Sequence, residues 1–132
     1  SMSSKANKKE FTMKIAITTK GKDLDSKIDP RFGRAESFII YDTEECKYEV
    51  IDNIQNIESQ QGAGIQAAQN LVDKGAKALI TAHCGPKAFR VLNSAGVKIY
   101  ILAEGSVRTA IEKFKNNKLQ EMSDPNTEGH WM

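Results

Sequence analysis

The chain has 132 residues, of which 27% are charged and 39% hydrophobic, and its formal net charge is +2. This length suits one domain with a buried core and is too short for two. The small net charge and the scattered basic residues argue against a nucleic-acid-binding surface. No apolar stretch has the length of a membrane span or the pattern of a signal peptide. We therefore expect a single cytoplasmic domain with no nucleic-acid or membrane partner.

The cysteine content excludes several further classes. Cys46 and Cys84 are the two cysteines, and they form no C-x-x-C motif, which argues against a zinc ribbon or a redox dithiol. A structural disulfide is not expected in the cytosol. We expect residues 1–12 to be a disordered tag or N-terminal extension, residues 13–119 to form the domain, and residues 120–132 to be a flexible C-terminal tail.

The first half of the chain predicts three strands. Residues 14–19 form a short β-rich segment that is followed by a long polar loop. Residues 37–42 and 47–52 are two further β-rich segments on either side of a four-residue polar turn. A turn of that length is typical of a hairpin, so these two strands are predicted to be antiparallel.

The second half predicts helices that alternate with strands. Apolar residues recur at helical spacing after Gly62, after Pro86 and after Ser106. Short apolar runs at 78–81 and 97–102 separate these helices and predict two more strands. A hairpin followed by such an alternation predicts an α/β fold, with a mixed sheet that is covered by helices on both faces.

The segment His83-Cys84-Gly85-Pro86 lies at a predicted strand-to-helix junction. A helix N-terminus lowers the pKa of a thiol, so Cys84 is predicted to be a thiolate that ligates a soft metal or attacks an electrophile. The alternative is that Cys84 is a small buried residue and His83 an ordinary loop histidine. His130 in the tail could fold back to join the site, or it could belong to a frayed terminus.

A second candidate site lies in the loop after the first predicted strand. Arg31 and Arg34 flank Phe32 and Gly33 there, an arrangement that suits an anionic ligand with an apolar face. The alternative is a proline turn with solvated arginines. Ligands of open α/β sheets bind at the carboxyl ends of the strands, so this loop and the Cys84 junction are expected at the same end.

A third glycine-rich segment opens the first predicted helix. Gly62-Ala63-Gly64 begins a match to G-x-G-x-x-A, the dinucleotide-binding pattern. A strand does not directly precede it, and Cys84 stands where that pattern needs an acidic residue, so a nicotinamide cofactor is not expected. The N–H groups of this helix start could receive an anion, although a plain helix start is the alternative.

Taken as a set, these segments resemble the dinitrogenase iron-molybdenum cofactor biosynthesis family, the NifX-like domain that also ends NifB proteins. The resemblance extends over about residues 13–119 and implies a ribonuclease H-like fold with a five-stranded mixed sheet. It also implies a non-enzymatic protein that binds, stores or hands over iron-sulfur or iron-molybdenum type clusters, with cluster donor and acceptor proteins as partners. The positions that match the family pattern are Asp29, Arg31, Phe32, Gly33, Gly62, Gly64, Gly85 and Pro86. All of these except Pro86, together with Arg34, are predicted to bind the cofactor.

An assembled cluster brings its own sulfides, so it needs one or two protein ligands where a bare zinc ion needs about four. We therefore predict that His83 and Cys84 ligate the cluster, that Arg31 and Arg34 neutralise its charge, and that His130 is a further candidate ligand. The chain is expected to be a monomer or a weak homodimer.

Two other functions stay open. Cys84 with His83 as base could make a cysteine-dependent enzyme, or the chain could be an interaction or regulatory domain without metal. A nuclease is not expected, because two-metal chemistry needs a carboxylate on the first strand and residues 14–19 contain none.

Overall fold

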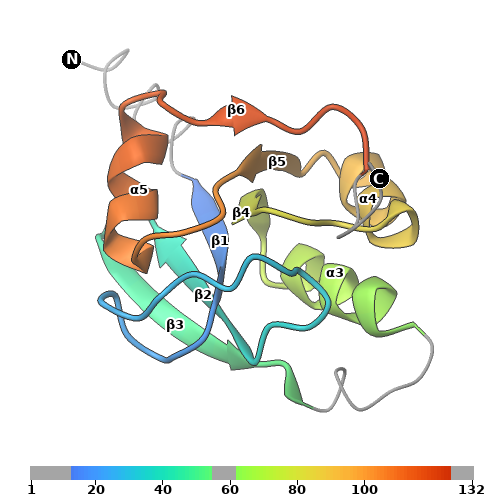
Figure 1. Cartoon of the computed structure of the whole chain (residues 1–132), viewed down its shortest axis with the longest axis horizontal. Helices are drawn as coiled ribbons and strands as arrows, with labels where there is room; N and C mark the ends of the chain where they lie inside the picture. The colour runs from blue at the N-terminus through green and yellow to red at the C-terminus, as the bar shows by residue number, and fades with distance from the viewer. Residues whose placement is uncertain (1–12, 55–61, 126–132) are drawn as a thin grey trace, which may run out of the picture.

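The structure, a computed structural model, describes residues 13–54 and 62–125 (Figure 1). Within these ranges six strands form one sheet in the order β3-β2-β1-β4-β5-β6. The strands are β1 (Lys14–Thr19), β2 (Ser37–Asp42), β3 (Lys47–Asp52), β4 (Ala76–Thr81), β5 (Lys98–Ile101) and β6 (Gln120–Glu121). The described helices are α3 (Ala63–Asp73), α4 (Pro86–Ser94) and α5 (Val107–Lys115). The predicted mixed α/β fold is confirmed.

The antiparallel half of the sheet contains β1, β2 and β3. Alternate side chains of β2 are buried on opposite faces, Phe38 and Ile40 on one and Ile39 and Tyr41 on the other. A strand that is buried on both faces reads as a continuous apolar run, which explains the sequence of β2. The predicted hairpin between β2 and β3 is present, and Cys46 in its turn has a positive φ of 58°.

The parallel half contains β1, β4 and β5, so the carboxyl ends of these strands lie at one end of the sheet. Gly75, with a φ of +85°, follows α3 and allows the chain to turn sharply into β4. Pro86 is in the first turn of α4, where a missing N–H costs nothing, and Ser106 caps α5 by accepting the N–H of Thr109. These helix boundaries are the ones that the sequence predicts.

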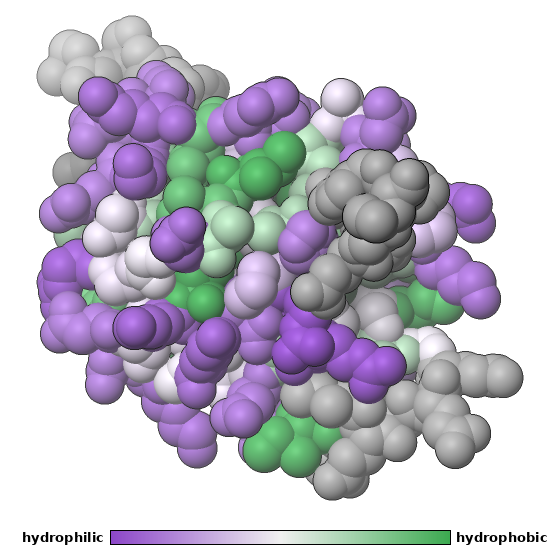
Figure 2. Space-filling view, viewed as in Figure 1, coloured by the Kyte–Doolittle hydropathy of each residue, from purple (hydrophilic) through white to green (hydrophobic). Residues whose placement is uncertain are grey.

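Helices cover both faces of the sheet, as expected. One core forms where α3 and α4 pack on the sheet, with Leu71, Leu79 and Leu92 fully buried. The other core forms under α5, with Ile17, Ile80 and Val107 fully buried. Figure 2 shows hydrophobic side chains at the surface between α5 and the strands β5 and β6, while hydrophilic side chains cover most of the rest of this face.

The expectation of five strands is wrong, because Gln120–Glu121 adds the sixth strand. This short strand pairs antiparallel with β5, and the N–H of Met122 donates to the carbonyl of Ile99 at 2.7 Å. Met122 is buried, so the chain immediately after residue 119 is part of the folded domain. One methionine in a polar stretch is too weak a pattern to predict this strand. Residues 1–12 and 126–132, which were expected to be disordered and flexible, lie outside the described ranges.

No helix in the described ranges is long and apolar enough to span a membrane.

Candidate functional site

The loop after β1 is hydrogen-bonded to the segment after β4. The carbonyl of Pro30 accepts the N–H groups of Ala82, at 3.1 Å, and of His83, at 2.7 Å. The N–H of Phe32 donates in turn to the carbonyl of His83 at 3.0 Å, and Arg31 and His83 pair as a parallel β-bridge. The structure therefore brings together the two loops that the sequence places at one end of the sheet.

Two buried hydroxyl groups, at the ends of β1 and β4, contact the backbone of this loop. Thr18 and Thr81, near or at the carboxyl ends of β1 and β4, are fully buried, and their Oγ1 atoms lie 3.1 Å apart. The Thr18 hydroxyl donates to the carbonyl of Asp29 at 2.5 Å, and Thr81 Oγ1 lies 3.4 Å from the carbonyl of Pro30. Sequence reasoning did not single out these threonines. The signal was available in the polar residues that end two otherwise apolar strands.

The carboxylate of Asp29 makes a hydrogen bond within the loop. Its side chain is buried, and Oδ1 accepts the backbone N–H of Arg31 at 3.0 Å and lies 3.9 Å from Nε of the same arginine. The Arg31 side chain is half exposed. This geometry turns the guanidinium outward and gives the carboxylate a local structural role. Direct contact between this carboxylate and an anionic ligand would be repulsive.

Phe32 anchors the loop in the core. Its side chain is 1% exposed and stacks on Phe38 of β2, with 5.3 Å between the ring centroids. Stacked aromatic pairs add to the free energy of burial. The Phe32 side chain therefore anchors the loop to the sheet. The next residue, Gly33, lies close to Gly64 at the start of α3.

A cavity of about 320 Å³ lies where this loop meets the first turns of α3 and α4. In Figure 1 the loop, coloured blue to cyan, extends across to α3. The three segments that carry the family resemblance all contribute to the cavity, and we call it the glycine pocket. Its lining residues are Phe32, Gly33, Gly62, Gly64, Ile65, Gly85, Pro86, Lys87 and Ala88.

Both helices begin at this pocket without a polar cap. The N-cap residues are Gly62 for α3 and Gly85 for α4, and as glycines they have no side chain that could cap the helix. Neither first turn contains an acidic residue. Unsatisfied N–H groups at a helix start carry partial positive charge and favour anions. Lys87 in the lining, together with the exposed Arg31 and Arg34 on the adjoining loop, adds full positive charges.

The expected thiolate at Cys84 is wrong. Cys84 immediately precedes Gly85, the N-cap residue of α4. Its side chain is fully buried in the core under α3 and α4. Burial raises the pKa of this thiol from its ordinary value of 9.0 to about 12. Removal of the sulfur from water outweighs the attraction of the helix end, because the side chain points into the core.

The remaining candidate ligands are not gathered into a metal centre in the described part of the chain. His83 is half-buried, with its Nδ1 atom fully enclosed, and His130 lies outside the described ranges. Within residues 13–54 and 62–125 no three side chains of His, Cys, Asp or Glu come close enough to hold a metal ion. The lining of the glycine pocket includes none of these four residue types among the described residues.

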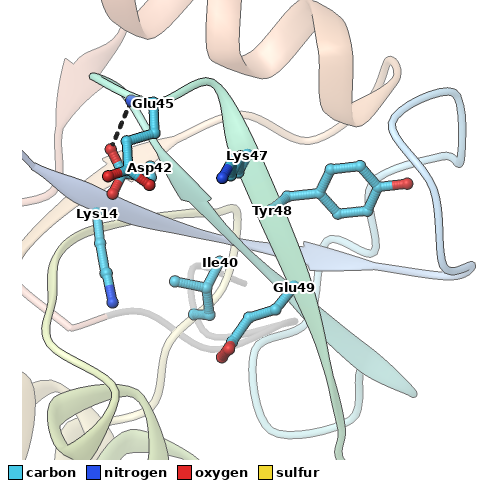
Figure 3. A pocket seen from close by; sticks show the side chains of 7 residues that line it. All are labelled: Lys14, Ile40, Asp42, Glu45, Lys47, Tyr48 and Glu49. Atoms are coloured by element: carbon cyan, nitrogen blue, oxygen red, sulfur yellow. Dashed lines mark hydrogen bonds between the residues drawn. The ribbon is translucent and has the colours of Figure 1, made fainter.

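Two further cavities have less suitable chemistry. One of about 220 Å³ lies beside the β2–β3 hairpin and mixes Lys14 and Lys47 with acidic residues (Figure 3). The Asp42 carboxylate there accepts the N–H groups of Glu45 and Glu44, and these bonds lower its pKa. This carboxylate therefore stabilises the hairpin turn.

The other cavity, of about 430 Å³, lies by the start of α5. The first N–H groups of α5 are already used, since Val107 and Arg108 donate to the carbonyls of Ser26 and Leu24. This helix start is therefore closed to an anion, unlike those of α3 and α4.

The fold and the pocket define a class of protein: a small mixed α/β domain with a largely apolar, glycine-rich pocket that contains one lysine, at the carboxyl ends of its parallel strands. Residues 13–117 match the model of the family described as "Dinitrogenase iron-molybdenum cofactor". The chain belongs to this family, and the resemblance inferred from its motifs is confirmed.

Solved structures and a curated relative are similar to this chain over most of its length. The apo form of the orange protein from Desulfovibrio gigas is 40% identical, with a TM-score of 0.84 over 87% of this chain and 97% of that one. A putative NifB protein from Thermotoga is 43% identical, with a TM-score of 0.78 over 89% of this chain and 99% of that one. An uncharacterized protein from Methanocaldococcus jannaschii is 30% identical over 112 residues, which are 83% of this chain and 91% of that protein.

Proposed function

We propose that this protein binds an anionic metal-sulfur cluster, of iron-sulfur or iron-molybdenum type, in the glycine pocket and carries it from a donor to an acceptor protein. The observation that carries the proposal is the meeting of the three family segments around one cavity, at two helix starts whose N-cap residues are glycines, with no acidic residue among the described lining residues. Family membership supports a cluster-related role. The ribonuclease H-like assignment is part of the same proposal, and the order β3-β2-β1-β4-β5 supports it.

The chemistry of the lining suggests how the cargo is held. Glycine, phenylalanine, isoleucine and proline provide no metal ligand, whereas N–H groups and Lys87 can contact the sulfide surface of a complete cluster. We therefore replace the predicted Cys84 ligand by contacts of this kind, in which the protein recognises the charge and the sulfur atoms of the cargo. His83 remains a candidate ligand at the edge of the site.

The second candidate function, a cysteine-dependent enzyme, has less support. A thiol with a pKa of about 12 is almost entirely protonated at neutral pH, and Cys84 is fully buried away from any substrate. An enzymatic role for this residue would need the core to open.

Anaerobic titration with tetrathiomolybdate, a simple anion of molybdenum and sulfide, tests the proposal. We expect one anion per chain, and affinity that decreases with added salt. Arg31→Ala and Lys87→Ala should each weaken binding about tenfold, equivalent to about 1.4 kcal/mol. Lys77→Ala is a matched control, because Lys77 is exposed near the opposite end of β4. Absence of binding to the wild type, or equal losses in all three variants, would contradict the proposal.

A further inference from the structure

Two of the glycines in the pocket, Gly33 and Gly64, do not have the conformation that usually requires glycine. Gly62, Gly75, Gly96 and Gly105 all have a positive φ, between 79° and 113°, which L side chains rarely adopt. Gly33 and Gly64 are absent from that set, so backbone strain does not explain their identity.

Close packing does not require these two glycines either. A Cβ atom added at Gly33 would lie 3.5 Å from Cα and 3.6 Å from N of Gly64. One added at Gly64 would lie 3.4 Å from Cβ of Ala88. These are ordinary van der Waals distances, so the described part of the fold can hold alanine at both positions. Gly21, away from the pocket, differs, because a Cβ atom there would clash with the side chain of Ser26.

For Gly64 the fold itself favours a different residue. Gly64 is the second residue of α3, and alanine is the better helix former because it loses less backbone entropy on folding. Folding stability alone therefore selects against this glycine. Residues that depart from the most stable choice without a structural reason tend to mark functional sites.

The position of both glycines supplies the reason. Gly33, Gly64 and Ala88 all line the cavity, and a Cβ added at Gly33 would meet the backbone of Gly64, while one added at Gly64 would meet Ala88 of α4. We infer that Gly33 and Gly64 determine the size of the cargo: without a Cβ at either position, a bulky sulfide-bearing anion can rest against the backbone of α3 and the loop. This inference rests on the proposed function, and it names two specificity-determining residues within that site.

Gly33→Ala and Gly64→Ala test it, with melting temperature and tetrathiomolybdate affinity measured on the same samples. We expect Gly64→Ala to raise the melting temperature by about 2 to 4 °C and Gly33→Ala to change it by less than about 2 °C. Both should weaken binding about tenfold or more. Gly75→Ala is the matched control: its positive φ should make it less stable, while the folded protein binds as the wild type does.

Each alternative result separates the two claims. Wild-type affinity in both alanine variants would overturn the size inference and leave the proposed function standing. A lower melting temperature together with weaker binding would show that these glycines are structural, and would also overturn the inference. Failure of the wild-type protein to bind the anion would remove the proposed function and the inference with it.

Discussion

Arg31 and His83 lie side by side as a parallel β-bridge, 52 positions apart in the chain, between the loop after β1 and the segment after β4. This pairing adds a short piece of parallel sheet beyond the ends of the two strands. It places Arg31 beside the chain that leads into α4, where Gly85 and Lys87 line the glycine pocket. The position of the Arg31 guanidinium therefore depends on the residues that hold this loop, which are Thr18, Thr81 and Asp29.

We expect Thr18→Val to loosen this loop. Valine has the shape of threonine but lacks the hydroxyl that donates to the carbonyl of Asp29, and it leaves Thr81 without one of its contacts. An unsatisfied buried carbonyl should cost about 1 to 3 kcal/mol of unfolding free energy, measured by urea denaturation. Hydrogen exchange at the N–H of His83 should accelerate as well. An unchanged midpoint and unchanged exchange would mean that the hydroxyl pair does not hold the loop.

Asp29→Asn and Asp29→Ala should separate the structural role of this residue from a binding role. Asparagine keeps an oxygen that can accept the N–H of Arg31, so we expect a small loss of stability. Because a negative charge is removed, we expect the affinity for the anion to be unchanged or about two- to fivefold higher. Alanine loses the acceptor and should cost about 1 to 2 kcal/mol. Much weaker binding in a stable Asp29→Asn protein would show that the carboxylate contacts the cargo.

Cys84 should make stability fall at alkaline pH. Burial raises the pKa of the Cys84 thiol to about 12 in the folded protein, while the thiol of the unfolded chain ionises near 9.0. Below pH 9 the thiol is protonated in both states and the unfolding free energy is at its full value. As the pH rises from 9 towards 12, ionisation of the unfolded chain lowers the unfolding free energy. Between pH 8 and pH 10 the unfolding free energy of the wild type should fall about 1.4 kcal/mol more than that of Cys84→Ala. Parallel pH profiles of the two proteins would mean that the thiol is not buried in solution.

The two cysteines should differ strongly in their reaction with a thiol reagent. Cys46 is exposed in the hairpin turn and should react in the native protein, whereas Cys84 should react only after unfolding. Titration with an aromatic disulfide should therefore give one fast thiol, which Cys46→Ser removes. A fast-reacting thiol in Cys46→Ser would have to be Cys84 and would revive the cysteine-dependent enzyme.

Sequence patterns were sufficient for most of the framework and for the meeting of two candidate loops at one end of the sheet. The hairpin, the proline start of α4 and the Ser106 cap depend on local residue preferences, which a sequence states directly. The same end of the sheet was expected for the loops of Arg31 and His83, because parallel strands share their carboxyl ends. The family segments were found, but their convergence on one cavity follows from packing between distant residues.

The errors have a common physical origin in tertiary burial. A low pKa was expected for Cys84 because it lies next to a helix start. Its side chain instead points into the core, and burial raises the pKa. The strand β6 was missed because its pairing with β5 comes from a tertiary contact of Met122 and not from local pattern. Thr18 and Thr81 had a local signal, as polar residues at the ends of apolar strands, but the loop that they contact could be identified only from the tertiary structure.

The central claim is that the glycine pocket holds an anionic metal-sulfur cargo, and an NMR titration of ¹⁵N-labelled protein with tetrathiomolybdate tests it most directly. We expect the largest amide shifts at Gly33, Gly64, Gly85 and Lys87, with Cys46 and the hairpin turn unaffected. Shifts centred on Glu44 and Glu45 or on Gly105, or no saturable shifts at all, would contradict the claim.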